Sequence, residues 1–286
     1  MDTKIILLTG AGSGIGKLTA LVLAKLGHQV IATTENHKQA DLLKQDAQAL
    51  NIPLQVEKLD ITNETDRETA WNWDIDILVN NAAIKEGGSL VDIPEENFRR
   101  QYEVNVFGTL LFTQGFARKM VERGSGRIVF VSSVSGLMVN PFSGPYSSSK
   151  YAVEAIAKTL SQELQGFNVE VATINPGPYL TGFNDREFNT WKTWNDQPSE
   201  RIFNYEKLAF PFAQEDPVDT VVPAVRAILG KTKKFRNVIP KKLIPAIQLV
   251  NAWDWLKRSD CRLGKQNFFV KQAYQRAPAS HGEYMM

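Results

Sequence analysis

Short apolar runs alternate with helix-like segments through residues 4–174, and this rhythm restricts the possible folds more than any other feature. The runs are rich in isoleucine and valine and are apolar at consecutive positions, as strands are when both faces of a parallel sheet are covered. They occupy residues 4–9, 29–34, 54–59, 76–80, 127–132 and 170–174. Segments with helical spacing lie between them, at 15–26, 36–50, 95–123 and 146–165. The alternation predicts βαβ units and a single α/β domain with a doubly wound parallel sheet.

The alternation stops after Pro176, where an aromatic-rich segment begins. Within residues 179–212 the aromatic side chains are Tyr179, Phe183, Phe188, Trp191, Trp194, Phe203, Tyr205, Phe210 and Phe212. An insertion after the carboxyl end of a strand lies where open α/β folds bind ligands. Two interpretations stay open, a lid over an apolar substrate or a small satellite core. Asp216-Pro217 then predicts a further helix, with the aspartate as its cap and the proline at its first position.

The first apolar run leads into a glycine-rich turn, Thr9-Gly10-Ala11-Gly12-Ser13-Gly14-Ile15-Gly16, which precedes a helical segment. Glycines permit a tight turn and let the backbone approach a pyrophosphate, while the helix N-terminus supplies free N–H groups and the positive end of a dipole. A glycine pattern alone is weak evidence, but its position between a strand and a helix is the context that dinucleotide binding requires. The turn therefore predicts a dinucleotide site.

Tyr146 and Lys150 stand four residues apart in a predicted helix, which puts both side chains on one face. Reducing a carbonyl requires a proton for the developing alkoxide, and oxidising an alcohol requires a base. A free tyrosine has a pKa of about 10, and a neighbouring ammonium lowers that pKa because it favours the phenolate. The pair is therefore a candidate for general acid–base catalysis near neutral pH.

Together these motifs resemble those of the short-chain dehydrogenases/reductases, and the resemblance covers residues 4–182 in order. The family's glycine motif, Thr-Gly-x3-Gly-x-Gly, is matched by Thr9, Gly10, Gly14 and Gly16. The resemblance implies a Rossmann-type domain over residues 1–240. It also implies an NAD(P)-dependent oxidoreductase that moves a hydride between a nicotinamide cofactor and an alcohol or ketone, and the aromatic insertion suggests that this substrate is apolar.

The resemblance assigns four catalytic residues. Ser133 lies thirteen residues before Tyr146, which is the family's spacing and selects Ser133 over Ser132 as the hydrogen-bonding partner of the substrate oxygen. Tyr146 is the implied general acid and base, and Lys150 assists it and also binds the ribose of the cofactor. Asn105 matches the family's asparagine, which is thought to bend its helix and to hold a water beside the lysine.

The cofactor residues carried over from the family follow the same order along the chain. They are Gly10, Ser13, Gly14, Ile15, Gly16, Glu35, Asp60, Ile61, Asn81, Ala82, Ala83, Tyr146, Lys150, Pro176, Gly177 and Thr181. Ala83 departs from the family, whose Asn-Asn-Ala-Gly motif ends in glycine, and it slightly crowds the nicotinamide side.

NAD is favoured over NADP on the residues that follow the second strand. Family members that use NADP typically have a basic residue at the position of Glu35 or of Ser13, and the Glu35 carboxylate would repel a 2′-phosphate. The family's usual NAD aspartate position is held by Thr34, so the match is imperfect. Lys17 and Lys38 leave NADP as the alternative.

Two other functions compete with a dehydrogenase. A redox sensor or scaffold would bind NAD(P) without turnover, but such proteins lose the tyrosine or the lysine. An epimerase or dehydratase of nucleotide-sugars has the glycine spacing Thr-Gly-x2-Gly-x2-Gly and a larger C-terminal substrate domain, and neither feature is found here.

Charge and metal-ligating residues narrow the partners further. The single cysteine, Cys261, and three scattered histidines provide no zinc-site spacing, so we expect no metal. The cysteine usage and the lack of a signal-peptide layout suggest a reducing, cytoplasmic location. With a net charge of only +2, we expect no nucleic-acid partner. The family resemblance implies a homodimer or homotetramer, built through the helices at 95–123 and 146–165.

Residues 241–286 form a basic C-terminal extension. From Lys231 onward there are twelve Lys/Arg and three Asp/Glu, a balance of +9, so the preceding residues carry −7. Residues 243–256 place an apolar stripe at helical spacing, which fits a helix packed on the domain or on a partner subunit. Flanked by Lys241, Lys242, Lys257 and Arg258, it also resembles a helix that lies on an anionic membrane, and packing is the favoured interpretation.

Overall fold

The computed structural model describes residues 2–187, 189–207, 212–256 and 270. Its centre is a seven-stranded sheet with the order β3-β2-β1-β4-β5-β6-β7, in which every neighbouring pair is parallel. The strands are β1 (Ile5–Leu8), β2 (Gln29–Thr34), β3 (Gln55–Lys58), β4 (Ile77–Asn80), β5 (Gly126–Val131), β6 (Val169–Pro176) and β7 (Arg236–Ile239). The order runs outward in opposite directions from β1 and from β4, so the predicted α/β Rossmann-type fold is confirmed.

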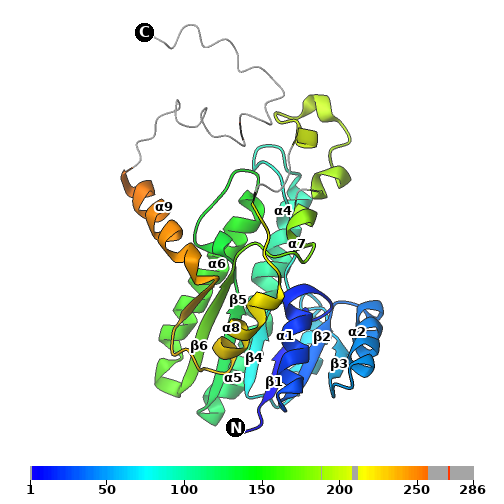
Figure 1. Ribbon diagram of the computed structural model, residues 1–286, viewed down its shortest axis with the longest axis vertical. Coiled ribbons are helices and arrows are strands. Elements are labelled where there is room, and N and C mark those ends of the chain that lie inside the picture. Colours follow the sequence, from blue (N-terminus) through cyan, green and yellow to red (C-terminus); the bar gives the residue numbers. More distant parts are fainter. Residues whose placement is uncertain (1, 188, 208–211, 257–269, 271–286) are drawn as a thin grey trace.

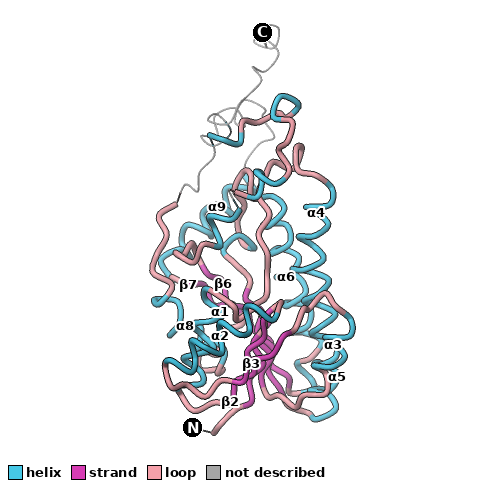
Figure 2. The backbone as a smooth tube through the Cα atoms, turned by 90° about the vertical axis from the view of Figure 1, so that its right-hand side faces the viewer, coloured by secondary structure: helices cyan, strands magenta, loops and turns pink. Residues whose placement is uncertain are grey.

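Helices cover both faces of the sheet, which gives three layers (Figures 1 and 2). On one face lie α1 (Gly14–Lys25), α2 (His37–Ala49) and α8 (Val218–Ile228), and on the other α3 (Glu64–Ala70), α5 (Thr109–Arg123) and α6 (Gly144–Glu163). β1 illustrates the packing, since Ile6 and Leu8 belong to the first core and Leu7 to the second. Strands covered on both faces have no polar side, which is why they appear as unbroken apolar runs.

Three local expectations need correction. α3 and β7, of seven and four residues, were not predicted, because elements this short have little periodicity. The expected helix at 95–123 is divided into α4 (Glu95–Tyr102) and α5 by a π-helical segment, Glu103–Gly108. α8 begins at Val218, one residue late, although the Asp216 carboxylate does cap it by accepting a hydrogen bond from the Val218 N–H at 2.9 Å.

The segment after β6 contains α7 (Phe183–Glu187) and a small aromatic cluster. In this cluster Phe142, Trp194 and Tyr205 are buried against one another, with Trp191 and Phe203 packed around them. The rings meet edge to face, at centroid distances of 5.0 Å for Trp194–Tyr205 and 5.1 Å for Phe142–Phe203. Phe188 and Phe210 lie outside the described residues.

The buried carboxylate of Asp92 fastens this cluster to the loop that follows β4. It accepts hydrogen bonds from the backbone N–H groups of Ile202 (3.0 Å) and Phe203 (3.2 Å) and from the Tyr205 hydroxyl (3.0 Å). Burial and the neighbouring Asp92 raise the pKa of Tyr205, so its hydroxyl stays a hydrogen-bond donor. A carboxylate shared in this way connects residues that are more than a hundred positions apart in the chain.

The apolar stripe near the C-terminus is divided between two environments. In α9 (Ile244–Leu256), Ile247 is buried beside Leu137 and Val238, so the first half of the helix packs on its own domain. The second half is exposed, up to 90% at Trp255. Lys257, Arg258 and most of the basic extension lie outside the described residues. Among the described residues no helix is both long and apolar enough to cross a bilayer.

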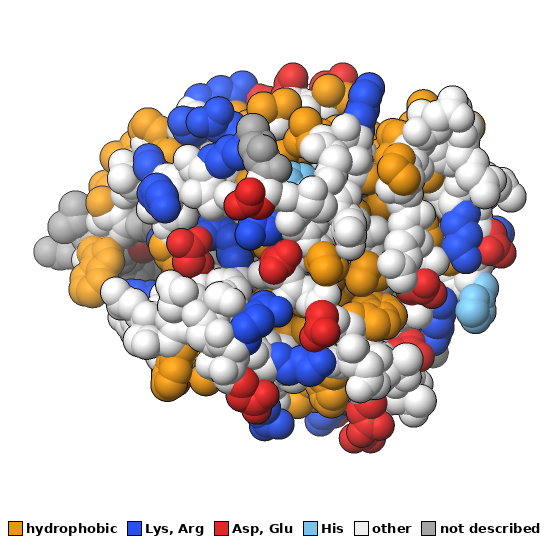
Figure 3. Space-filling model, turned by 90° about the horizontal axis from the view of Figure 1, so that it is seen from below, with side chains coloured by type: hydrophobic (Ala, Val, Ile, Leu, Met, Phe, Trp, Pro, Cys, Tyr) orange, Lys and Arg blue, Asp and Glu red, His pale blue; other side chains and the backbone are white. Residues whose placement is uncertain are grey.

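The opposite end of the molecule, at the N-terminal edge of the sheet, is seen from below in Figure 3. Lysine and arginine side chains gather in the upper left of this view, and elsewhere on this face they are mixed with aspartate and glutamate.

Candidate active site

A single cavity at the carboxyl ends of the strands collects the residues that the sequence motifs assign. Every residue carried over for cofactor binding lines it, and so does Ser133. In an open α/β sheet this edge, where the order reverses between β1 and β4, is the usual ligand site. Asn105 is the one predicted site residue that does not line the cavity.

The glycine turn is shaped by close contact with the loop after β4. Gly10 has φ +68°, and a Cβ there would lie 2.6 Å from the Cα of Ala82. A Cβ on Gly16 would lie 2.4 Å from the Asn81 amide nitrogen. That amide donates to the carbonyl oxygens of Thr9 and Gly10, each at 2.9 Å, and so fixes the two loops against each other. Only glycines permit this approach, and the resulting cradle at the N-terminus of α1 fits a pyrophosphate.

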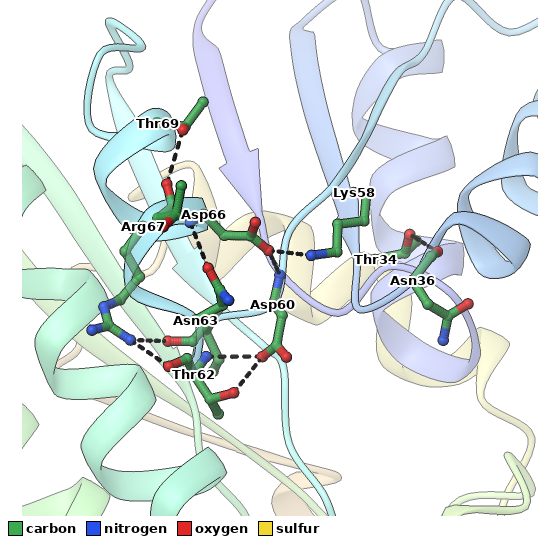
Figure 4. A network of polar contacts seen from close by, with 11 residues as sticks. Thr34, Asn36, Lys58, Asp60, Thr62, Asn63, Asp66, Arg67 and Thr69 are labelled. Carbon is green, nitrogen blue, oxygen red and sulfur yellow. Dashed lines mark hydrogen bonds and ion pairs between the residues drawn. The ribbon is translucent and has the colours of Figure 1, made fainter.

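The part of the cavity for which the resemblance implies adenosine binding includes residues that follow β2 and β3. Asp60 lines it, and its carboxylate accepts hydrogen bonds from the backbone N–H of Thr62 at 2.9 Å and from its hydroxyl at 2.7 Å (Figure 4). The Asp60 N–H in turn donates to Asp66 at 2.7 Å, which also pairs with Lys58. Those two hydrogen bonds lower the pKa of Asp66, although burial alone would raise it. The loop is therefore held in one shape before any ligand binds.

The residues on which the sequence analysis favours NAD over NADP lie near the cavity in part. Glu35 and Gln39 line the cavity beside Ser13. Lys17, one of the two lysines that left NADP open, is paired with Asp46 of α2 instead. Arg186 of α7 does line the cavity, and the sequence motifs did not single it out.

Tyr146 and Lys150 lie together in the first turns of α6, where both are buried and both line the cavity. The Lys150 ammonium donates to the carbonyl oxygen of Val131 at 2.9 Å and lies 5.7 Å from the centroid of the Tyr146 ring. Burial lowers the pKa of Lys150 to about 8, against the opposing effect of Glu154, and Lys85 lowers it further. The lysine is therefore cationic at neutral pH but close to its titration point.

Ser133 lies two residues after the end of β5 and lines the same cavity. Its hydroxyl oxygen accepts a hydrogen bond from the Ser135 N–H at 3.0 Å. Ser132, the alternative serine, also lines the cavity, but its hydroxyl oxygen is buried beside Gly136. Asn175 donates to the Ser133 carbonyl oxygen at 3.2 Å and to Glu154 at 2.5 Å, so β6 helps to fix this turn.

Asn105 lies in the π-helical segment, and its side chain forms hydrogen bonds to the loop after β4. Its amide accepts from the Ile84 N–H at 2.9 Å and donates to the Ile84 carbonyl oxygen at 3.0 Å and to the Ser149 hydroxyl at 3.1 Å. Gln101, which the sequence analysis did not name, repeats the arrangement on the next peptide. It accepts from the Glu86 N–H at 2.7 Å and donates to the Ile84 carbonyl oxygen at 3.0 Å.

A second lysine, Lys85, lies beside Tyr146 and belongs to none of the sequence motifs. Lys85 is 7% exposed, and its ammonium lies 4.8 Å from the centroid of the Tyr146 ring. The sequence held a signal, since a lysine five residues after the last residue of a buried strand lies at the ligand-binding edge of the sheet. Tyr179 and Phe183, which the sequence analysis names only within the aromatic segment, also line the cavity, and so does Asn184, which it does not name. Among the described residues no cluster of potential metal ligands is found.

Known proteins match this chain over the same region. The family model "short chain dehydrogenase" matches residues 4–192. The chain is 39% identical over 188 residues to the uncharacterized oxidoreductase YusZ of Bacillus subtilis (63% of this chain, 67% of that protein). It is 35% identical over 190 residues to the 3-ketodihydrosphingosine reductase of Bacteroides thetaiotaomicron (65% and 67%). It is 29% identical over 266 residues to human 17-beta-hydroxysteroid dehydrogenase type 1 (87% and 81%).

Solved structures agree on the fold. A short chain dehydrogenase/reductase from Burkholderia phymatum in complex with NAD superposes with a TM-score of 0.74 at 22% identity, covering 90% of this chain and 96% of that one. A short-chain dehydrogenase from Sphingobium yanoikuyae in complex with NADPH has a TM-score of 0.70 at 21% identity (90% and 98%). With the family model spanning most of the chain and the motifs gathered in one cavity, the protein belongs to the short-chain dehydrogenase/reductase family and is an NAD(P)-dependent oxidoreductase.

Proposed function

We propose that the protein interconverts an alcohol and a ketone, with Tyr146 as general acid and base. The observation that carries the proposal is that Tyr146, Lys150 and Ser133, all three buried, line the same cavity. The bound nicotinamide supplies the hydride chemistry. The Ser133 hydroxyl holds the substrate oxygen, Tyr146 gives its proton to that oxygen in reduction or takes it in oxidation, and Lys150 favours the phenolate.

A panel of alcohols and ketones, followed in both directions by nicotinamide absorbance, tests this activity. We expect turnover with at least one secondary alcohol or its ketone. Tight binding of the cofactor with no turnover across the panel would instead favour a redox sensor or scaffold.

We infer that the substrate is largely apolar. Ile84 and Phe183 line the cavity, and Phe183 packs edge to face against the Tyr146 ring at 5.8 Å. The names of two relatives point the same way, since one acts on a ketosphingoid and one on a steroid. We further propose that α7 forms the wall of the substrate site and that Trp191, Trp194, Phe203 and Tyr205 form a satellite core, because none of these four lines the cavity.

NADH should bind more tightly than NADPH by about tenfold or more. The repulsion between a carboxylate and a 2′-phosphate costs about 1.4 kcal/mol or more of binding free energy, which is the size of a one-unit pKa shift caused by a neighbouring charge. The reason is that the Glu35 carboxylate lines the cavity and that the other family position for a basic residue is occupied by Ser13. Lys17 is paired with Asp46. Titration of both reduced cofactors by quenching of tryptophan fluorescence measures the ratio. Glu35→Arg should reverse the preference, and tighter NADPH binding by the wild type would assign the phosphate contact to another base such as Arg186.

The protein should be a homodimer or homotetramer, because apolar side chains are exposed on the helices that the family resemblance places at the interface. Phe107 is 50% exposed in the π-helical segment, with Leu111 of α5 and Tyr151 of α6 also exposed. Light scattering at micromolar concentration measures the mass, and Phe107→Glu should shift it toward the monomer. A monomeric wild type would contradict this assignment.

A further inference from the structure

Lys85 is buried against the aromatic ring of Tyr146. Lys85 lies on the loop after β4. Its ammonium is 4.8 Å from the ring centroid of Tyr146 and 5.9 Å from the ring centroid of Phe183. It donates a hydrogen bond to the Asn184 side-chain oxygen at 2.8 Å. The Asn184 amide in turn donates to the Tyr179 carbonyl oxygen at 3.3 Å and to Gln214 at 2.9 Å. The lysine therefore connects the general acid and base with α7.

The backbone on both sides of Lys85 is fixed by buried amides. Asn105 makes two hydrogen bonds to the peptide groups of Ile84, and Gln101 makes one to Ile84 and one to the N–H of Glu86. The next side chain, Glu86, is also buried and pairs with Arg100 at 2.8 Å. With both neighbours held, the Lys85 side chain is directed toward Tyr146.

Burying an ammonium is expensive unless polar or aromatic groups replace its lost hydration. Asn184 replaces one hydrogen bond, and the faces of two aromatic rings attract the cation through their quadrupoles. A phenolate attracts a cation far more strongly than a phenol does, because the ring then carries a full negative charge. Lys85 therefore interacts best with Tyr146 after the tyrosine has lost its proton.

We propose that Lys85 is a positioning residue for the proton transfer at Tyr146. Its ammonium stabilises the phenolate from the face of the ring, in addition to Lys150 on α6, and both lysines together set the pH range in which Tyr146 exchanges its proton with the substrate. The proposal rests on the proposed function only for the identity of the proton's partner. The ionisation of Tyr146 itself can be measured without any substrate.

The proton and electron balance is that of carbonyl reduction. In that direction a bound reduced nicotinamide would supply the hydride, with both electrons, that the carbonyl carbon receives. The O–H bond of Tyr146 breaks as the O–H bond of the product alcohol forms, and the phenolate is reprotonated from solvent. Oxidation reverses each change. Lys85 gives up no proton and no electron in either direction.

The charged groups around Tyr146 come from three elements. Lys85 lies on the loop after β4, Lys150 on α6, and Arg186 of α7 lines the same cavity. Glu154, one turn beyond Lys150, is engaged by Arg236 at 2.7 Å and by Asn175. Lys85 contributes to the lowered pKa of Lys150, which agrees with two ammonium groups acting on one ring.

Three variants separate the charge of Lys85 from its structural role. Lys85→Gln keeps a donor for Asn184 but removes the charge, and Lys85→Arg keeps the charge. Lys119→Gln is the matched control, because Lys119 lies on α5 and is paired with Asp74 at the other edge of the sheet. Tyrosinate absorbance of the ligand-free protein is measured against pH, and each protein is compared with its own Tyr146→Phe derivative so that only Tyr146 contributes.

We expect the Tyr146 midpoint to rise by about one pH unit in Lys85→Gln, the size of a shift caused by one nearby opposite charge. Lys85→Arg should lie close to the wild type, and Lys119→Gln should equal it. Where a substrate is known, the pH profile of kcat/KM for oxidation should move by the same amount. Below both midpoints the oxidation rate should fall about tenfold, which corresponds to one pH unit.

An unchanged midpoint in a folded Lys85→Gln would overturn the proposal and leave Lys85 a structural residue. Asn184→Asp offers a second test that keeps Lys85 in place, since a carboxylate at that hydrogen bond neutralises the ammonium and should also raise the midpoint. No shift there would overturn the proposal as well. Failure to find any substrate would count against the proposed function alone, because the absorbance titration still decides the role of Lys85.

Discussion

Replacing Tyr146 by phenylalanine is expected to lower turnover by about 10²–10⁴-fold, the contribution of one positioned proton-transfer group. The ring is buried and packs edge to face on Phe183, so the substitution removes the hydroxyl and keeps the packing. The thermal midpoint and the cofactor dissociation constant should therefore change little, and the loss should appear in kcat. Steady-state kinetics with the best substrate of the panel measures it.

Tyr151→Phe is the matched control, because Tyr151 lies five residues further along α6 and its side chain is exposed. Partial desolvation and the nearby Asp254 raise the pKa of Tyr151, so its hydroxyl stays protonated at neutral pH. This control should keep wild-type kinetics. Near-normal turnover in Tyr146→Phe would remove Tyr146 from the proton transfer, whatever substrate is used.

Lys150→Met should have the second large effect, and it should act in opposite directions on activity and stability. The methionine loses the cation that favours the phenolate, so kcat/KM should fall by about 10²–10⁴-fold, the full value of the proton transfer that it supports. The affinity for the cofactor should fall too, because the family resemblance assigns a ribose contact to this lysine. Both losses are measured with the same assay and fluorescence titration.

Stability should change the other way in the ligand-free protein. The pKa of Lys150 is about 8 in the fold and 10.5 in the unfolded chain, so between these values the unfolded chain binds more protons. The free energy of unfolding therefore rises with pH across this window, by roughly 3 kcal/mol in all. Below pH 8 the wild type carries the full cost of the buried charge.

Lys150→Met removes this cost and loses the hydrogen bond to the Val131 carbonyl oxygen, a loss of about 1–2 kcal/mol. Below pH 8 the variant should be more stable than the wild type by about 1–2 kcal/mol, and the rise with pH should disappear. Urea unfolding at a series of pH values measures both. A variant that is less stable than the wild type at pH 7 would show that the buried ammonium stabilises the fold.

The sequence predicts the sheet because burial on both faces leaves an unmistakable pattern. Every residue of β4 is buried, and its run is apolar until Asn80. In β7 only the C-terminal end is buried, since Arg236 at its start is exposed. Four residues at the edge of a sheet are also too few to show a hydrophobic pattern. The π-helical segment was missed for another reason, because a hydrogen-bond shift by one residue leaves the apolar spacing of the neighbouring helices intact.

Site residues were predictable where a motif carries them. Gly10, Gly16 and Asn81 interlock in a way that no other residues would permit, so their spacing is diagnostic. Lys85 and Gln101 act through tertiary contacts instead. Gln101 lies on α4 and forms a hydrogen bond to the loop after β4, and no local sequence pattern predicts such a contact. Contacts of this kind become visible only when the chain is folded.

The Asp92 carboxylate has a consequence for the dynamics of the insertion after β6. It holds the N–H groups of Ile202 and Phe203 in backbone that belongs to no named helix or strand. Their amide hydrogens should therefore exchange slowly with solvent deuterium, in a stretch where the absence of regular structure suggests rapid exchange. Since one carboxylate holds both groups, both should exchange in the same opening event. Their common rate then reports how often the aromatic cluster detaches from the loop after β4.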